Sequence, residues 1–289
     1  MAQSPSIFSF GEVLWDLFPA GPQLGGAPAN FACHAALQGG KVSLVSAVGV
    51  DELGQRAAEL LGKYQLDLSL LQTTSVAPTG SVGVSLDAHG SPTFTIHSPS
   101  AWDHIAWSEQ LAAAILKSQA VYFGTLGQRS EVSRATIRRA LQVACEAGVR
   151  RVLDINLRKP SYDAALIEES LQLASLLKLS AEELPIVAAA CGISSGSTAE
   201  MLRILLTKYD LELVAMTLGA DGALLVTATD KYAQPGIPTV VSDTVGAGDS
   251  FTAALVMGVL KHDPPPTVLR TACELAARTC AHAGALPPV

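Results

Sequence analysis

The feature of this sequence that most restricts its fold is a repeated alternation between short apolar runs and longer segments with helical periodicity. Each apolar run has the length and composition of a buried β-strand, and each longer segment spaces its apolar residues along one helix face. Alternation of this kind predicts an α/β fold with a largely parallel sheet and helices on both faces. We expect strands at residues 7–10, 42–48, 121–123, 152–155, 177–179, 213–218 and 223–226, and helices at about 31–37, 55–64, 130–147, 166–176, 181–190, 198–209, 250–261 and 266–282.

One stretch breaks this alternation. Apolar and polar residues alternate over residues 82–86, a turn is expected at Asp87-Ala88-His89-Gly90, and the alternation returns over residues 94–96. A period of two residues indicates strands with one apolar face, so the stretch predicts a β-hairpin that projects from the main sheet. We expect this hairpin to act as a lid. An exposed apolar face on the lid would favour a homodimer.

The chain is expected to form one domain over residues 1–289, with lid segments at about 16–24 and 79–103. Its hydrophobic content of 49%, with 16% charged residues, supports a large buried core. The net charge of −7 and the lack of a basic stripe argue against a nucleic-acid partner. Apolar stretches such as residues 251–260 are too short to span a membrane, and the N-terminus lacks a signal peptide. Five cysteines without C-x-x-C spacing indicate reduced thiols, so we expect a cytoplasmic protein.

The strongest chemical signal is a glycine-rich turn before an apolar helix, Asp243-Thr244-Val245-Gly246-Ala247-Gly248-Asp249-Ser250-Phe251. Gly246, Ala247 and Gly248, here called the glycine turn, let the backbone approach a ligand, and their N–H groups can converge on an anion. Asp249 follows as a proton acceptor. This arrangement suits the transfer of a phosphoryl group to a hydroxyl that loses its proton. A plain strand–helix turn with an acidic first helical turn would also explain a bare G-x-G-D pattern.

A second polar cluster lies near the N-terminus, where Gly25 and Gly26 precede Asn30. The glycines let a small polar ligand approach the main chain, and the Asn30 amide can both donate and accept hydrogen bonds. Asp16, a little earlier, can accept two hydroxyl protons. The cluster therefore predicts a polyol site. A loop followed by a helix that Asn30 caps is the alternative interpretation.

A third cluster follows the expected strand at residues 152–155. Strand alternation would place Asp154, Asn156 and Arg158 on one face, at a strand end that borders the crevice of an open α/β sheet. Arg158 could then offer a fixed cation to a phosphate. An internal Asp–Arg pair that caps a loop is the alternative.

Three further segments allow both a structural and a functional interpretation. Ser180 and Glu183 fit a capping box at the start of a helix. The loop from Thr217 through Gly219 to Gly222 lets a nucleotide lie against backbone, or is an ordinary Asp-Gly turn. A group of small residues late in the chain could pack against the flat base of a nucleotide, or could allow two helices to pack closely. These residues are Ala276, Ala277, Cys280, Gly284 and Ala285.

Two nucleotide-binding motifs are absent. The sequence contains no G-x-x-x-x-G-K-[ST], which excludes a P-loop kinase, and no complete G-x-G-x-x-G after its first strand. The six histidines show no metal-ligand spacing, and His34 is expected to make packing or solvent contacts.

The string from Asp243 to Phe251 resembles the C-terminal signature of the ribokinase-like (PfkB) family of carbohydrate kinases. The resemblance extends from Gly11-Glu12 to Gly284-Ala285, and residues 10–30 look most like fructokinases. It implies a ribokinase-like three-layer α/β sandwich with a mostly parallel central sheet and a small β lid. It also implies an ATP-dependent kinase that phosphorylates a primary hydroxyl of a small free sugar, most of all fructose.

The same resemblance assigns roles to individual residues. Asp249 would be the catalytic base, and the amides of Gly246, Ala247 and Gly248 would stabilise charge on the transferring phosphoryl group. Residues implied to bind sugar are Asp16, Gly25, Gly26, Asn30 and Arg158. Residues implied on the nucleotide side are Lys178, Thr217, Gly219, Gly222 and Cys280. Glu183 would organise Mg²⁺ through water, and main chain near Asp243 and Val245 would bind K⁺.

Three positions depart from the pattern of related sugar kinases. His97 replaces an arginine that many fructokinases carry in the lid, Trp102 stands where an acid is often found, and Ser180 replaces an asparagine. The first two departures concern the sugar more than the reaction. A nucleoside kinase of the same fold and a non-catalytic sugar-binding regulator are the alternatives. A nucleoside kinase would need a larger apolar platform in the lid. The intact Asp249 motif argues against a non-catalytic regulator.

Overall fold

The protein is described by a computed structural model over residues 4–19, 21–86 and 92–288. Within these residues one sheet has nine strands in the order β13-β12-β11-β10-β9-β8-β1-β4-β5. All neighbouring strands from β5 to β11 run parallel, whereas β12 is antiparallel to both of its neighbours. The strands are β1 (Ser6–Phe10), β4 (Lys41–Gly49), β5 (Leu71–Thr74), β8 (Ala120–Gly124), β9 (Arg150–Asp154), β10 (Leu176–Ser180), β11 (Leu213–Thr217), β12 (Gly222–Thr227) and β13 (Lys231–Pro235).

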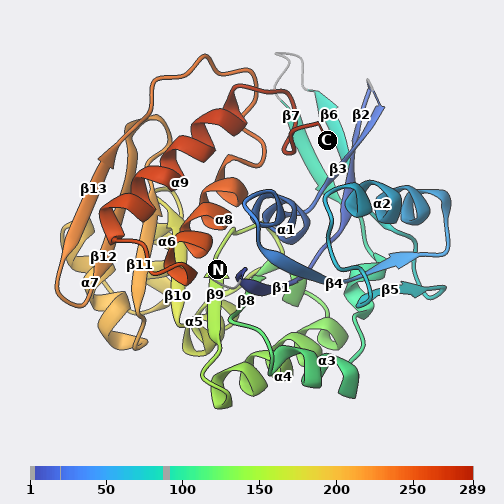
Figure 1. The fold of residues 1–289 in the computed structure, drawn as a ribbon, viewed down its shortest axis with the longest axis horizontal. Helices are drawn as coiled ribbons and strands as arrows, with labels where there is room; N and C mark the ends of the chain where they lie inside the picture. Colours follow the sequence, from blue (N-terminus) through green and yellow to red (C-terminus); the bar gives the residue numbers. More distant parts are fainter. Residues whose placement is uncertain (1–3, 20, 87–91, 289) are drawn as a thin grey trace.

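Helices cover both faces of this sheet, as predicted (Figure 1). One face carries α1 (Ala27–Leu37), α2 (Glu52–Lys63), α8 (Ala247–Leu260) and α9 (Pro265–Cys280). The other face carries α3 (Glu109–Ile115), α4 (Glu131–Glu146), α5 (Ala164–Leu173), α6 (Leu184–Ala190) and α7 (Thr198–Lys208). The fold is a three-layer sandwich of the ribokinase-like kind that the sequence predicts.

The central strands are mostly apolar because side chains on both of their faces are buried. Ile7 packs in the cluster under α1 and α8, and its neighbour Phe8 packs in the cluster under α4 and α5. Leu176 and Leu177 divide between the two clusters in the same way. Such strands appear in a sequence as continuous apolar runs, which is why the alternation was visible there.

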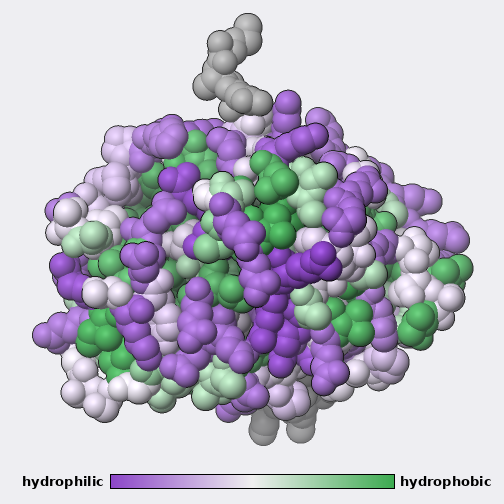
Figure 2. Space-filling model, turned by 90° about the horizontal axis from the view of Figure 1, so that it is seen from below, coloured by the Kyte–Doolittle hydropathy of each residue, from purple (hydrophilic) through white to green (hydrophobic). Residues whose placement is uncertain are grey.

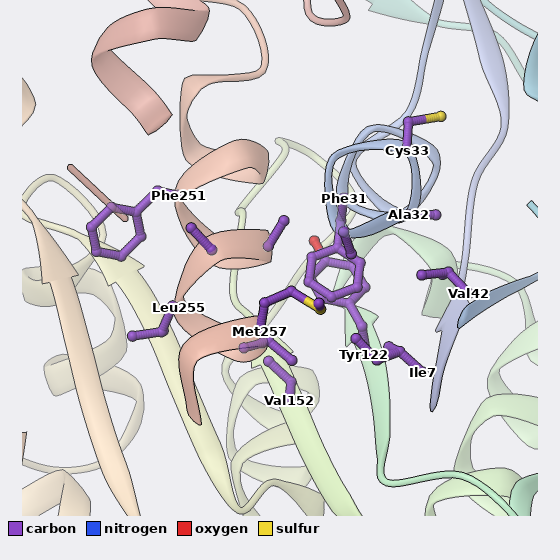
Figure 3. Close-up of a cluster of buried hydrophobic side chains, with 14 of the residues drawn as sticks. Ile7, Phe31, Ala32, Cys33, Val42, Tyr122, Val152, Phe251, Leu255 and Met257 are labelled. Carbon is purple, nitrogen blue, oxygen red and sulfur yellow. The ribbon is translucent and has the colours of Figure 1, made fainter. Parts of the chain in front are cut away.

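Packing between α1, α8 and the sheet fixes the relative position of the two helices. The Phe31 ring of α1 stacks on the Tyr122 ring of β8, with centroids 4.0 Å apart and planes inclined by 14°. Met257 of α8 lies beside this pair in the same buried cluster (Figure 3). Aromatic stacking adds about 0.5–1.5 kcal/mol to the gain from apolar burial. This packing holds α1 and α8 against the same part of the sheet.

A second sheet of four strands lies beside the sandwich, in the order β3-β2-β6-β7 within the described residues. It joins β2 (Leu14–Phe18) and β3 (Gly21–Gly25) to β6 (Gly80–Leu86) and β7 (Pro92–Ile96). Strands β6 and β7 are antiparallel, with Val82 opposite Ile96, which confirms the predicted hairpin. The expected turn at Asp87-Ala88-His89-Gly90 lies outside the described residues. That this sheet moves as a lid is a proposal taken up in the Discussion.

The outer surface over α3 and α4 is mostly hydrophilic, with small apolar patches separated by polar side chains (Figure 2). This pattern fits α4, which buries Ile137, Ala140, Leu141 and Ala144 on one side only. Among the described residues no helix has both the length and the apolar character needed to cross a membrane.

Candidate active site

Residues from distant parts of the sequence meet at the carboxyl edge of the parallel strands. The loops after β1, β9 and β10 lie there, together with the first turns of α1 and α8. A hydrogen bond of 2.8 Å from Asn30 Nδ2 to Asp249 Oδ2 links α1 to α8 there. Ligands of open α/β sheets bind at this edge, so the site lies where the fold favours one.

The start of α1 places Asn30 inside the site. Gly26 is the N-cap residue with φ 106°, and a side chain at this position would collide with the backbone carbonyl of Glu12. Asn30 lies in the first turn of α1, so the expectation that it caps the helix is wrong. The residue is 4% exposed, and its Oδ1 atom has no hydrogen-bond partner among the described residues. A buried acceptor of this kind suits a ligand hydroxyl.

The start of α8 presents backbone N–H groups beside Asp249. Gly246 is the N-cap in the left-handed conformation, with φ 76°, and no side chain caps the helix among the described residues. The helix begins at Ala247, three residues before its expected start, so Asp249 lies in its first turn. Uncapped N–H groups at the N-terminus of a long helix favour an anion.

The surroundings of Asp249 raise the pKa of its carboxyl group. Burial raises the pKa of its carboxyl above the ordinary value, although the hydrogen bond from Asn30 and the charges of Lys178 and Arg158 oppose the shift. A raised pKa brings a carboxylate base closer to neutral pH, where general bases are most effective. Asp249 remains partly accessible, because the residue is only half-buried.

A buried cation borders the glycine turn. Lys178 Nζ lies 3.1 Å from Asp154 Oδ1 and 3.1 Å from where a Cβ atom on Gly248 would be. The Thr252 hydroxyl, 2.9 Å from Asp154 Oδ2, holds the other side of that carboxylate. Burial alone would lower the pKa of Lys178, but the carboxylates of Asp154, Glu183 and Asp249 outweigh it and raise the pKa. Lys178 is therefore a fixed positive charge at neutral pH.

A further carboxylate, Glu12, is buried in this region, and sequence reasoning missed it. Glu12 is 3% exposed and lies two residues after the end of β1. Burial, with a smaller contribution from Asp249, raises the pKa of Glu12 to about 7. The signal that could have revealed it is an acidic residue placed shortly after a buried parallel strand, at the edge where ligands bind.

Asp16 and Arg158 lie on the side of the site nearest the small sheet. A Cβ atom on Gly25 would lie 2.7 Å from Asp16 Oδ2, so these two residues are in close contact. Burial raises the pKa of Asp16, and Arg158 opposes that shift. The predicted alternation through Arg158 is wrong, because β9 ends at Asp154 and Asn156 has a φ of 39°. The alternative Asp–Arg pair is also wrong, because the partner of Asp154 is Lys178.

Glu183 connects two loops at the edge of the sheet. Its Oε2 atom accepts from Ser180 N over 2.7 Å, and Glu183 N donates back to Ser180 Oγ over 3.3 Å, as the capping-box pattern predicts. Its Oε1 atom accepts from Leu157 N in the loop after β9. Helix α6 itself begins only at Leu184, three residues after the predicted start. Glu183 is thus held by backbone from two sides.

Apart from Lys178, the residues expected on the nucleotide side lie between the end of β11 and the start of β12, and at the end of α9. Gly219 is exposed, and Thr217 O accepts from Ala181 N. A side chain at Gly222 would collide with the backbone of β13, which explains this glycine without a ligand. The Cys280 carbonyl accepts from Ser242 N and Asp243 N, so Cys280 fixes the loop that leads to the glycine turn.

A pocket of about 290 Å³ lies between this loop and α9. Its lining includes Ala277, one of the small residues noted in the sequence. The other lining residues are Ile237, Pro238, Thr239, Glu274, Arg278, Ala281 and His282.

The carboxylate of Asp243 shapes the loop before α8. Its Oδ1 atom accepts from Val245 N over 3.0 Å, and its Oδ2 atom accepts from Gly284 N over 2.9 Å. No group of three or more His, Cys, Asp or Glu side chains that could hold a metal ion occurs in the described part of the chain.

Comparison with known proteins gives consistent results. A profile of pfkB family carbohydrate kinases matches residues 20–289. The fructokinase of Klebsiella pneumoniae is 30% identical over 285 residues, which cover 95% of this chain and 91% of the relative. The aminoimidazole riboside kinase of Salmonella typhimurium is 30% identical over 239 residues, covering 80% and 72%. The crystal structure of Vibrio cholerae O395 fructokinase with fructose, ADP and calcium superposes with a TM-score of 0.82 at 27% identity, covering 97% of this chain and 94% of that one.

Proposed function

The chain belongs to the pfkB family of carbohydrate kinases, and we propose that it transfers the γ-phosphoryl group of ATP to a primary hydroxyl of fructose. Because the chain belongs to this family, it is a phosphotransferase that acts on a sugar hydroxyl. The observation that carries the proposal is the Asn30–Asp249 hydrogen bond, which joins a buried amide with a free acceptor to a carboxylate beside the glycine turn. Fructose as acceptor is supported by the fructokinases among its relatives.

The proposed reaction uses Asp249 as the base. The sugar lies against Asp16, Gly25, Gly26 and Asn30, and Asn30 Oδ1 accepts from one of its hydroxyls. As the attacking oxygen forms its bond to the γ-phosphorus, its proton passes to Asp249, and the bond from phosphorus to the ADP oxygen breaks. Phosphoryl transfer asks the protein mainly for positioning and charge stabilisation.

The charge that develops on the phosphoryl group is met from two sides. The N–H groups of the glycine turn point to it from the start of α8, and Lys178 adds a buried positive charge beside Gly248. Arg158 supplies a more exposed cation. Because these groups are fixed before the reaction begins, little reorganisation is needed during transfer.

The pocket against Ala277 has room for the adenine base. Thr217, Gly219 and Gly222 are proposed to contact the nucleotide as well. Use of ATP is supported by a sugar kinase from Pyrococcus horikoshii, 28% identical, that was solved with ATP. Mg²⁺ would arrive with ATP and neutralise its phosphates. Glu183 suits water-mediated contact with this ion, because backbone fixes both of its oxygens and each keeps a lone pair.

A K⁺ ion near the glycine turn is part of the same proposal. The carbonyl oxygens of Asp243 and Val245 accept no hydrogen bond from described residues, so both are available to a cation. A double mutant of the Vibrio cholerae fructokinase was solved with a potassium ion. The ion would order the loop that leads into α8.

A nucleoside substrate is the second candidate, because aminoimidazole riboside kinase is also a relative at 30% identity. The test is kcat/KM for fructose, ribose, adenosine, fructose 6-phosphate and ketodeoxygluconate, measured by ADP formation under one set of conditions. His97 bonds to Ser81 over 2.9 Å and stands where many fructokinases carry the permanent cation of an arginine, so we expect anionic sugars to be poor substrates. A phosphorylated or acidic sugar that wins would contradict the fructose assignment, and adenosine in first place would establish a nucleoside pocket. No ADP formation with any acceptor would indicate a binding regulator.

A further inference from the structure

His34 lies on the same side of α1 as Asn30, one helical turn later. It is 2% exposed, and its Nε2 atom is 2.8 Å from the carbonyl oxygen of Ala285, near the other end of the chain. The sequence offered packing or solvent contact for this residue, whereas the structure shows a buried hydrogen bond. Because a carbonyl oxygen can only accept, the Nε2 atom carries the proton and the imidazole is the donor.

The segment that His34 holds is the chain end, residues 283–288, here called the C-terminal segment. It returns across the molecule toward α1 (Figure 1). Ala285 packs directly against Gly246, since a Cβ atom on Gly246 would lie 2.6 Å from the Cβ of Ala285. The neighbouring Gly284 N donates to Asp243 Oδ2 over 2.9 Å. The C-terminal segment therefore touches the loop before α8 at Asp243 and at the first residue of the glycine turn.

These contacts form a second connection between α1 and the start of α8. The first is direct, from Asn30 to Asp249, and lies in the site. The second runs from His34 through Ala285 to Gly246 and lies behind the glycine turn. One face of α1 is thus linked directly to Asp249 and, through Ala285, to the glycine turn.

We infer that His34 is a positioning residue that sets the glycine turn for phosphoryl transfer through the carbonyl group of Ala285. This inference rests on the proposed role of the glycine turn as the phosphate site. His34 is buried and contacts the C-terminal segment, so its effect should appear in the nucleotide half of the reaction. A small displacement of Gly246 would move N–H groups that must meet the developing charge.

The chain offers a matched control for this inference. Tyr64 OH donates to the carbonyl oxygen of Pro287 over 2.7 Å and so holds the same C-terminal segment two residues farther along. Among the described residues, no hydrogen bond joins Tyr64 or Pro287 to the glycine turn. A role limited to fastening the chain end would be shared by Tyr64 and His34, whereas a positioning role belongs to His34 alone.

The experiment compares His34→Leu, His34→Gln and Tyr64→Phe in the full-length chain. Steady-state kinetics give kcat, KM for ATP and KM for the sugar, and hydrogen exchange reports the amides of residues 243–249. We expect His34→Leu to speed exchange there and to lower kcat/KM for ATP by roughly tenfold or more, with little change in sugar KM, since a shift of about 1 Å can cost ~10²-fold. His34→Gln keeps an N–H donor and should restore most of both signals, and Tyr64→Phe should leave both near the wild-type values.

The exchange measurement does not depend on turnover, so the inference and the proposed function fail in different ways. Unchanged exchange in His34→Leu would overturn the coupling between His34 and the glycine turn. Faster exchange with unchanged kinetics would overturn the positioning role and would also count against the glycine turn as phosphate site. Equal kinetic losses in His34→Leu and Tyr64→Phe would show that His34 only anchors the chain end. If His34→Leu fails to fold, His34→Gln and Tyr64→Phe are compared instead. Kinetics equal to those of Tyr64→Phe, with unaltered exchange, support the donor role of His34. Slower turnover together with faster exchange in His34→Gln contradicts that role.

Discussion

Asn30 Nδ2 donates a hydrogen bond of 2.8 Å to Asp249 Oδ2 across 219 residues of sequence. The two residues lie in the first turns of α1 and α8, which pack against each other on one face of the central sheet. The bond joins the segment proposed to hold the sugar to the carboxylate proposed to take its proton. A hydroxyl that reaches Asn30 Oδ1 is thereby brought next to the base.

Glu12 should make the stability of the protein depend on pH. Its pKa is raised to about 7 in the folded protein, against a usual value near 4.5, so the folded state binds this proton more tightly. The stabilising contribution is complete below pH 4.5 and is lost as the pH rises through 7. The full change is about 3 kcal/mol in the free energy of unfolding. Glu12→Gln should therefore gain stability relative to wild type between pH 5 and pH 8.

Urea unfolding of both proteins at several pH values measures this difference, in which the titration of other groups largely cancels. Glu182→Gln is the matched control, because Glu182 is exposed and its pKa is lowered by hydrogen bonds to its own backbone and to Ser180. It should show no trend between pH 5 and pH 8. A difference for Glu12→Gln that stays constant over this range would contradict the buried, proton-binding state of Glu12.

Lys178 should matter for the phosphoryl group rather than for the sugar. Lys178→Met removes the buried charge beside Gly248, and we expect kcat to fall by roughly 10²-fold, the usual effect of losing one preorganised charge or donor. KM for the sugar should change little. Initial rates with varied ATP and varied sugar separate the two effects.

Thr252→Val is the matched control for Lys178. It removes the hydroxyl that contacts Asp154 but leaves the Lys178–Asp154 pair in place, so it should cost about 1 kcal/mol of stability and less than about tenfold in kcat. A loss of activity in Thr252→Val as large as in Lys178→Met would show that the buried network, and not the Lys178 charge, limits the reaction.

The sequence predicted the elements whose burial is visible as a pattern. A strand buried on both faces, such as β8, is a continuous apolar run, β10 is one apart from Lys178, and the β6–β7 hairpin shows its period of two. Strands β5 and β13 were missed because edge strands such as Leu71–Thr74 and Lys231–Pro235 contain mostly polar or exposed residues. Strands β2 and β3 were missed because Asp16, Pro22 and Gln23 interrupt the run of apolar residues that marks a strand.

The site was less accessible to sequence reasoning because its links are between distant residues. The glycine turn and Asn30 could be identified as polar or small residues in suggestive places. Their meeting depends on how α1 and α8 pack, which no local pattern contains. The Lys178–Asp154 pair was missed for the same reason, since neighbouring parallel strands bring the two residues together. Arg158 was misplaced because the backbone leaves the strand after Asp154.

The small sheet should respond to sugar. We propose that β6 and β7 close over the site when sugar binds, which would exclude water from the γ-phosphate and limit ATP hydrolysis. Hydrogen exchange with and without saturating sugar should show added protection in β6 and β7, while the central strands β1 and β4 serve as the unchanged reference. Equal protection of β6 and β7 in both conditions would argue against a lid.

The most direct test of the whole account is the rate of phosphoryl transfer by Asp249→Asn. The variant keeps the shape of the side chain and should keep the fold, so calorimetric binding of ATP and of sugar should stay close to wild type. Without a base, kcat should fall by roughly 10²–10⁴-fold, the usual contribution of such a group. That result, with binding preserved, is what the account predicts. Activity within a fewfold of wild type would contradict it and remove Asp249 from the centre of the reaction.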